Sequence, residues 1–190
     1  YFGWPIWNPN NNTMWLSWMD RGQNNLKCYE INMSNGSKKE VYKEYQKTWI
    51  DLEDRVSGRF NFLADNKGYI VQSDASGWNQ LYLYSMDGKL DHAITNGKYT
   101  ITSIKLIDEK NKTIYFTARG IENTARVDFY SVGFDGKNLK RLSAGPYHYT
   151  LIELAPDNKH FVAMYSNAKT PTSFAVLDIP KKGDTHVDVL

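Results

Sequence analysis

The sequence contains one cysteine, no long hydrophobic run and no strong net charge. Because Cys28 is the only cysteine among the 190 residues, no disulfide can form within the chain. Its neighbours alternate between apolar and polar residues, so we expect a packed rather than a reactive thiol. No apolar stretch approaches the length needed to cross a bilayer, and no transmembrane segment is predicted. The formal net charge is +2 and the basic residues are scattered, which argues against nucleic acid as a partner.

The motifs of several enzyme classes are missing as well. None of the four histidines belongs to a His-Glu-x-x-His zinc motif. No Gly-x-Ser-x-Gly elbow presents a hydrolase serine, and the 13 glycines are dispersed rather than gathered in a phosphate-binding loop. We therefore expect no catalytic residue, no metal and no cofactor within these residues.

Two pairs of adjacent carboxylates have the chemistry to bind a cationic amine. Asp108–Glu109 is followed by Lys110–Asn111, and the four residues have the composition of a hairpin turn. Glu53–Asp54 lies in a less regular stretch, where carboxylates are usually solvated. We interpret both pairs as surface features rather than as a site.

Aromatic residues are abundant, whereas helical periodicity is scarce. Aromatic residues make up 14% of the sequence, and they suit the pleated surface of strands. No long stretch repeats apolar residues at helical spacing without a Gly, Asn or Asp interruption. The sequence therefore predicts an all-β protein with less than about a tenth of its residues in helices.

A repeat of about 50 residues runs through the chain. Each copy has a polar turn that leads directly into an apolar strand, and a later strand that ends at a glycine turn. The polar turns begin at Asn11, Asn66, Asn111 and Asn158, and the glycine turns lie at Gly36, Gly88, Gly136 and Gly183. Residues of this kind close β-hairpins because they tolerate positive φ. We therefore predict that each copy of the repeat folds into a unit of four strands.

The strands of this repeat contain continuous apolar runs rather than alternating ones. Examples are Tyr69–Val71, Leu81–Tyr84, Ile114–Phe116, Phe161–Met164 and Phe174–Leu177. A strand of this kind has to be covered on both faces, and the blades of a β-propeller cover one another in this way. We therefore predict a β-propeller with about four four-stranded antiparallel blades, at approximately residues 1–58, 59–103, 104–150 and 151–190. The alternative is an unrelated all-β domain with coincidental turns.

Several stretches resemble the propeller domain of the dipeptidyl peptidase IV family, and they follow the order found there. The similar residues are Arg21, Gln23 and Asn24 in a strand-turn, Ser73–Asp74, a Gly-aromatic step at Trp78 with Leu81 and Tyr82 after it, Thr95–Tyr99, and Tyr165–Asn167 with Thr170–Pro171. The likeness covers nearly the whole chain.

This resemblance implies part of an eight-bladed propeller that caps a C-terminal α/β-hydrolase domain. The parent protein would be a periplasmic or secreted serine peptidase that removes dipeptides from the N-termini of peptide substrates. Its catalytic residues would lie in the hydrolase domain. The segment Gly58-Arg59-Phe60 resembles one at the edge of the family's substrate cavity, which makes Arg59 and Phe60 candidate substrate-binding residues. A core position for Phe60 is the alternative, and we favour it.

Half of an eight-bladed ring would leave its first and last blades without a neighbour. We expect apolar residues to be exposed there, and the isolated chain to associate with itself through these end blades. The residues concerned are Trp15, Trp18 and Tyr29 in the first blade and Phe161, Met164 and Phe174 in the last. Trp78 is expected to be buried between adjacent blades.

A second functional hypothesis belongs to another class. A stand-alone propeller, or an inactive relative of the peptidases, would recruit a protein or another ligand instead of serving a peptidase. The blades cannot separate the two, because function depends on sites that are carried by a fold rather than on the fold itself. The absence of an initiator methionine at Tyr1 fits a piece of a longer protein.

Overall fold

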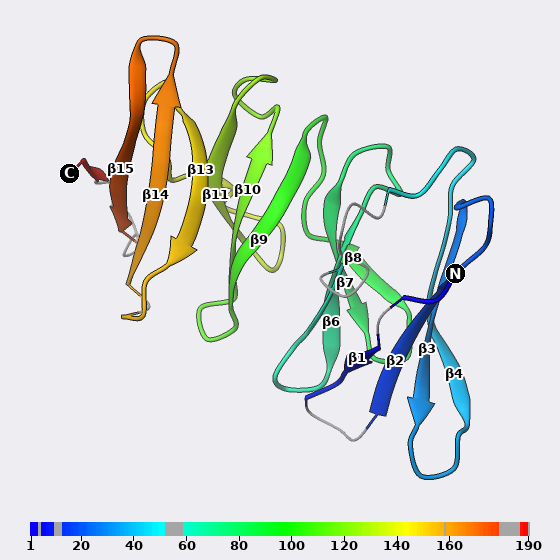
Figure 1. Ribbon diagram of the computed structural model, residues 1–190. Coiled ribbons are helices and arrows are strands. Elements are labelled where there is room, and N and C mark those ends of the chain that lie inside the picture. The colour runs from blue at the N-terminus through cyan, green and yellow to red at the C-terminus, as the bar shows by residue number, and fades with distance from the viewer. Residues whose placement is uncertain (4, 10–12, 52–58, 158, 179–186, 190) are drawn as a thin grey trace. The chain divides into compact units, whose positions relative to one another are not determined.

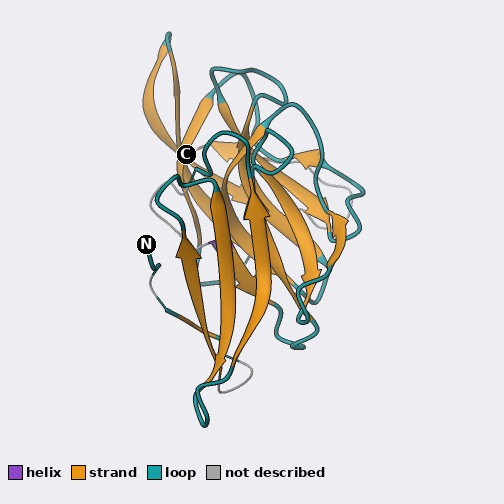
Figure 2. Cartoon of the chain, turned by 90° about the vertical axis from the view of Figure 1, so that its right-hand side faces the viewer, coloured by secondary structure: helices purple, strands orange, loops and turns teal. Residues whose placement is uncertain are grey.

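The computed structural model describes residues 1–3, 5–9, 13–51, 59–157, 159–178 and 187–189. The elements in this part of the chain are β-strands joined by loops and turns (Figures 1 and 2). They are β1 (Ile6–Trp7), β2 (Thr13–Met19), β3 (Asn25–Asn32), β4 (Lys38–Tyr45), β5 (Phe60–Phe62), β6 (Gly68–Ser73), β7 (Gln80–Ser85), β8 (Leu90–Ala93), β9 (Thr100–Asp108), β10 (Thr113–Arg119), β11 (Val127–Gly133), β12 (Lys140–Arg141), β13 (His148–Leu154), β14 (His160–Asn167), β15 (Thr170–Asp178) and β16 (Val187–Val189). Of the residues named from the sequence, the following lie outside the described residues: the turn residues Asn11, Asn158 and Gly183, the acidic pair Glu53–Asp54, and Gly58 of the cavity-like segment.

The strands form four antiparallel sheets of four strands each, as predicted. Consecutive strands are neighbours in every sheet: β1–β4, β5–β8, β9–β12 and β13–β16. The third sheet begins at Thr100 and the fourth at His148, a few residues before the blade limits expected at 104 and 151. Each sheet is therefore one copy of the repeat that the sequence contains.

The predicted hairpin turns have the backbone that their residues favour. Asn66 and Lys112 have φ values of 53° and 50°, and Gly88 has a φ of 84°. Gly88 is needed for a second reason, because a Cβ atom there would lie 2.6 Å from the backbone oxygen of Val41. Asp108 closes the turn before β10 by accepting a hydrogen bond from the Asn111 N–H at 3.0 Å. This acidic pair is a turn feature, as interpreted from the sequence.

The chain forms two compact units, and the first comprises Tyr1–Asn96. Its core joins the first two sheets around the fully buried Trp15. The Trp15 ring meets Phe62 and Tyr69 edge-on, at centroid distances of 4.7 Å and 4.8 Å. Such contacts add to the free energy gained from burying the rings. Cys28 belongs to the same core and is buried, as expected, and this burial raises the pKa of its thiol to about 12.

The second unit, Gly97–Leu190, has a separate core between the third and fourth sheets. Phe129 and Phe161 are fully buried there, with ring centroids 4.6 Å apart. Tyr115 packs on Phe161 at 5.8 Å. In each unit, aromatic residues from two sheets form the contact.

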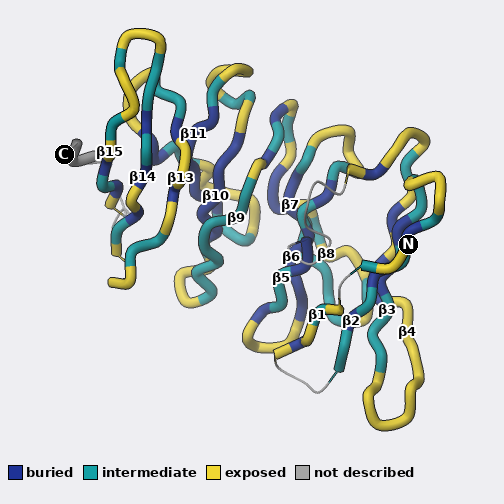
Figure 3. The backbone as a smooth tube through the Cα atoms, in the orientation of Figure 1, coloured by how far each residue is buried: buried dark blue, intermediate teal, exposed yellow. Residues whose placement is uncertain are grey.

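Burial along the strands differs between sheets (Figure 3). All residues of β11 except Gly133 are buried, so this strand is covered on both faces. In β14 and β15 buried and more exposed positions alternate, and Val162 and Phe174 are 42% and 58% exposed. The prediction that both of these runs are covered on two sides is therefore wrong.

The expected exposure of the end blades is correct for Phe174 but wrong for Trp15 and Phe161. The period of two in a strand explains this outcome, because successive side chains point to opposite faces. Phe161 and Ala163 face the core of their unit, whereas Val162 lies on the other face of the sheet.

Trp78 does not occupy a buried position. It lies in the turn before β7, directly after Gly77, whose φ is 87°. The turn lies outside the strands, and 42% of the Trp78 surface is exposed. The prediction of a buried Trp78 is therefore wrong.

Candidate functional site

The first unit contains a buried polar cluster that includes Arg59. We call it the Glu44 cluster, and its members are Tyr42, Glu44, Gln46, Arg59, Ser73 and Asp74. Glu44 comes from the end of β4 in the first sheet, whereas Ser73 ends β6 in the second sheet. The cluster therefore links two sheets by polar contacts beside the aromatic core.

Glu44 accepts hydrogen bonds from four side chains. Its Oε2 atom lies 3.1 Å from Arg59 Nη2 and 2.9 Å from the Ser73 hydroxyl, and it also accepts the Tyr42 hydroxyl. Its Oε1 atom accepts a hydrogen bond from Gln46 Nε2 at 2.7 Å. The side chain is only 3% exposed, so these partners replace the water that the carboxylate loses.

Arg59 is held on several sides. Besides Glu44, its guanidinium reaches Asp74 Oδ1 at 3.4 Å and donates from Nε to the Gln72 backbone oxygen at 2.8 Å. Its Nη1 atom is buried without a hydrogen-bond partner among the described residues. The Arg59 side chain is 6% exposed, so most of its hydrogen-bonding capacity is directed into the protein.

Two acidic groups share one guanidinium in this cluster. Burial raises the pKa of Asp74, and the nearby Glu44 carboxylate raises it further, while Arg59 opposes the shift. Burial also raises the pKa of the Tyr42 hydroxyl well above its usual value. The cluster thus has a net charge of about −1 when both carboxylates are ionised.

Phe60, the second candidate from the sequence, lies in the aromatic core of the first unit. It is 4% exposed and contacts Tyr42 and Trp15 at centroid distances of 5.3 Å and 5.7 Å. This agrees with the core position favoured from the sequence. Arg59 and Phe60 are consecutive, so the peptide between them joins the polar cluster to the core.

The remaining motif residues lie in the turn between β2 and β3 and in strand β7. Arg21 and Gln23 are exposed in the turn between β2 and β3, where Gln23 has a φ of 56°. The Asn24 N–H donates to Asp20 Oδ1 at 3.1 Å and so helps to close this turn. In β7, Leu81 is fully buried and Tyr82 is half-buried.

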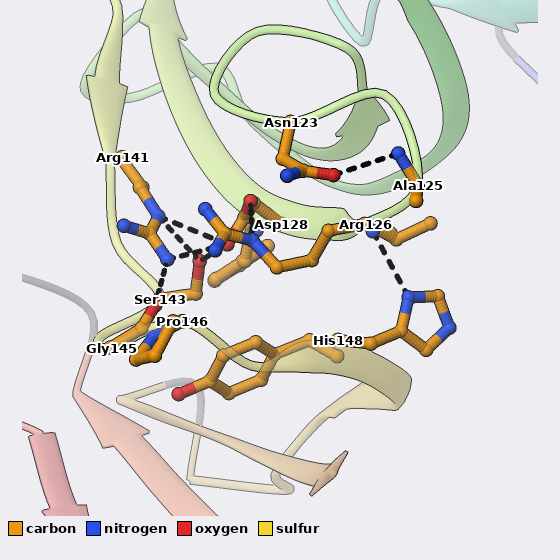
Figure 4. Close-up of polar contacts among 12 residues, drawn as sticks. Asn123, Ala125, Arg126, Asp128, Arg141, Ser143, Gly145, Pro146 and His148 are labelled. Atoms are coloured by element: carbon orange, nitrogen blue, oxygen red, sulfur yellow. Dashed lines mark hydrogen bonds and ion pairs between the residues drawn. The ribbon is translucent and has the colours of Figure 1, made fainter. Parts of the chain in front are cut away.

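The second unit contains another polar cluster, which the sequence analysis did not identify. We call it the Asp128 cluster, and it comprises Arg126, Asp128, Arg141, Ser143 and Gly145 (Figure 4). Arg126 precedes β11, Asp128 lies in β11, and Arg141 ends β12. Antiparallel pairing of β11 with β12 places Arg141 opposite Tyr130, close to Asp128.

Asp128 is bound by two arginines. Arg126 Nε lies 2.8 Å from Asp128 Oδ2, and Arg141 Nη2 lies 2.7 Å from Oδ1. Ser143 also donates its hydroxyl to Oδ1 at 2.8 Å, and Arg141 donates to the Gly145 backbone oxygen. Asp128 is 1% exposed, whereas the side chains of Arg126 and Arg141 are 16% and 25% exposed.

The sequence carried a signal for this cluster. Asp128 stands between Val127 and Phe129 in a strand that is otherwise buried, and a buried carboxylate requires a charged partner. Its arginine partners lie just before β11 and in β12, so the strand pairing was needed to find them. Beside the cluster, His148 accepts a hydrogen bond from the Val127 N–H through Nδ1 at 3.0 Å.

Two other kinds of feature are absent from the described ranges. No group of three or more His, Cys, Asp or Glu side chains there is arranged to hold a metal ion. No helix among these residues is long and apolar enough to span a membrane.

Repeated four-stranded meanders with aromatic contacts between their sheets define the blades of a β-propeller. The family model described as "Dipeptidyl peptidase IV (DPP IV) N-terminal region" matches residues 1–172. The chain therefore belongs to the dipeptidyl peptidase IV N-terminal region family.

Curated relatives carry a related name. Dipeptidyl peptidase 4 of Arthroderma otae is 40% identical over 112 residues, a match that covers 56% of this chain and 14% of the relative. Dipeptidyl peptidase 4 of Trichophyton rubrum is 40% identical over 90 residues, which cover 47% of this chain and 11% of that protein. The chain thus corresponds to a small part of the length of these relatives.

Solved structures show the same fold at lower identity. The crystal structure of Porphyromonas gingivalis dipeptidyl peptidase 4 matches with a TM-score of 0.76 and 22% identity, over 88% of this chain and 23% of that one. A putative dipeptidyl aminopeptidase IV from Bacteroides ovatus matches with a TM-score of 0.76 and 21% identity, over 94% of this chain and 27% of that one.

Proposed function

We propose that this chain is the propeller part of a dipeptidyl peptidase 4-like serine exopeptidase. Its parent would carry the α/β-hydrolase domain, and the propeller would shape and gate the cavity through which peptide substrates pass. The observation that carries this proposal is the family match over residues 1–172. The absence of a Gly-x-Ser-x-Gly elbow from the 190 residues supports a chain that is not catalytic by itself.

In this proposal, Arg59 and Phe60 support the wall of the cavity from within. The burial of Phe60 and the contacts of Arg59 with Glu44 and the Gln72 backbone oxygen support this role. A buried guanidinium with three kinds of partner holds the start of β5 in place. Direct contact with the substrate would then come from residues beside Arg59 rather than from its own side chain.

The exposed face of the fourth sheet has a role in the same proposal. Val162 pairs with Val176, and Met164 pairs with Phe174, so these four apolar side chains form one patch. In the parent, a further blade would cover this patch. In the isolated chain, the patch favours association between copies, because apolar surface gains free energy on burial.

The parent would act outside the cytoplasm, in the periplasm or after secretion. The resemblance to the dipeptidyl peptidase IV family supports this location. Fractionation of cells that express the full-length parent tests it, with an antibody against this chain as the detector.

Hydrolysis of a Gly-Pro chromogenic amide tests the central proposal. We expect the full-length parent to release the chromophore and the 190-residue chain to release none, because the nucleophile would belong to the other domain. Turnover by the chain that survives repurification would contradict the proposed division of labour. A folded parent that hydrolyses no dipeptide amide would favour the binding-module hypothesis instead.

A further inference from the structure

The Asp128 cluster contains more positive charge than its buried carboxylate neutralises. Two guanidinium groups contact one carboxylate, so the three side chains have a net charge of about +1. Arg119, which pairs with Val127, and Glu122, in the turn before Arg126, are opposite in sign. Neither forms an ion pair with a member of the cluster among the described residues.

Several N–H groups of the two arginines have no partner within the described chain. Arg126 uses its Nε to bind Asp128, and neither of its terminal nitrogens forms a hydrogen bond there. Arg141 uses Nε and Nη2, which leaves Nη1. Because both side chains are partly exposed, these donors reach the surface.

The second sheet shows that the fold does not require these charges. The Leu81 N–H donates to Thr95 Oγ1 at 2.9 Å, just as the Phe129 N–H donates to Ser143 Oγ at 3.2 Å. These matched bonds place Gln80 of the second sheet at the position that Asp128 has in the third.

The partners of Asp128 have uncharged counterparts in the same way. Tyr82 pairs with Ala93 as Tyr130 pairs with Arg141, and Trp78 precedes Gln80 as Arg126 precedes Asp128. The second sheet thus keeps the bond between the Leu81 N–H and Thr95 Oγ1 with tryptophan, glutamine and alanine at the three matched positions. The repeat by itself therefore requires neither the buried carboxylate nor the two arginines that bind it.

We propose that Arg126 and Arg141 form a binding site for the carboxylate group of an acidic peptide side chain. The planar fork of a guanidinium matches a carboxylate in geometry, and charge-assisted hydrogen bonds are the stronger kind. Asp128, Ser143 and the Gly145 backbone oxygen hold Arg141 in place before a ligand arrives. Little side-chain entropy is then lost on binding, which favours affinity.

Calorimetric titration of the full-length parent tests this site with a matched pair of tripeptides. The first is acetyl-Ala-Glu-Ala-amide, and the second has glutamine in place of glutamate, so the two differ only in the central charge. We expect the glutamate peptide to bind with a Kd of roughly millimolar size and at least about tenfold more tightly than the glutamine peptide. Equal affinities would overturn the proposal. Inorganic phosphate that binds more tightly than the glutamate peptide would overturn the assignment to a carboxylate.

Three variants locate the binding. Arg126→Gln should lower the affinity for the glutamate peptide about tenfold. Arg126→Lys should restore only part of this affinity, because an ammonium lacks the planar fork of a guanidinium. Lys110→Gln is the charge control, since it removes one positive charge from the turn at the other end of β10 and should leave binding unchanged. Unaltered binding by Arg126→Gln, with a normal melting curve, would refute the site. The same samples are assayed on a Gly-Pro amide, so a failed carboxylate site is distinguished from an inactive parent.

Discussion

The two units of this chain use buried carboxylates in opposite ways. In the Glu44 cluster, two carboxylates share one guanidinium that is almost fully buried. In the Asp128 cluster, two partly exposed guanidinium groups share one carboxylate. The first cluster joins strands of two sheets, whereas the second joins β11 to the adjacent β12 and the segment after it.

This difference distinguishes a cluster that stabilises the fold from a cluster that can bind a ligand. In a buried ion pair between sheets, the charged groups bind each other rather than a ligand. Removing one partner leaves the other charge buried and unpaired. Partly exposed arginines keep donors for a ligand and can turn toward water when their partner is lost. The Glu44 cluster therefore stabilises the contact between two sheets, and the Asp128 cluster is the better candidate for binding.

The largest expected effect follows from breaking each cluster at its central carboxylate. Glu44→Ala should lower the free energy of unfolding by about 3 to 5 kcal/mol, because Arg59 would remain buried with only a more distant acidic partner. Asp128→Ala should cost about 1 to 3 kcal/mol, since Arg126 and Arg141 already reach solvent. Urea denaturation of both variants and the wild-type chain, followed by circular dichroism, measures the difference. Equal losses would remove the distinction between the two clusters.

A smaller effect concerns the second carboxylate of the Glu44 cluster. Because the pKa of Asp74 is raised in the folded state, the folded protein holds this proton to higher pH than the unfolded chain does. The contribution of Asp74 to stability therefore falls as the pH rises from the ordinary value of 3.8 through the raised folded pKa.

Asp74→Asn should remove this dependence, since an amide does not titrate but still accepts the hydrogen bond from Gln46. We expect the wild-type chain to lose stability relative to the variant as the pH rises from 3.8 through the raised folded pKa of Asp74, which urea midpoints over this range would measure. A constant difference over the range would mean that Asp74 titrates as a solvated carboxylate.

Much of this fold was predictable because its signal is local and repeated. The turns at Asn66 and Gly88 need residues that tolerate positive φ, and the structure has positive φ at both. Apolar runs such as Tyr69–Val71 and Ile114–Phe116 lie in strands and are buried throughout. The faces of the fourth sheet were less predictable, because the run Phe161–Met164 does not reveal which of its sides is covered.

The polar clusters depend on contacts between residues that lie far apart in the sequence. Arg59 was identified because its segment resembles one at the edge of the family's substrate cavity. Its partner Glu44 belongs to another sheet, in a strand with many exposed charged residues. Asp128 was recognisable as a charge in an apolar strand, yet Arg141 reaches it only through the pairing of β11 with β12. Sequence patterns indicate such residues one at a time, and the register of the strands then brings them together.

The smallest expected effect concerns Trp78, which precedes β7 as Arg126 precedes β11. Since Trp78 lies in a turn and is 42% exposed, Trp78→Ala should lower the free energy of unfolding by only about 0.5 kcal/mol. Trp15→Ala is the matched control, because the same truncation in the core should cost about 3 to 5 kcal/mol. Both variants lose one tryptophan, so circular dichroism rather than fluorescence should follow their unfolding in urea. A loss for Trp78→Ala close to that for Trp15→Ala would show that this turn carries packing that holds the second sheet together. The matched positions would then be structural in both sheets, which would weaken the inference that Arg126 is available for a ligand.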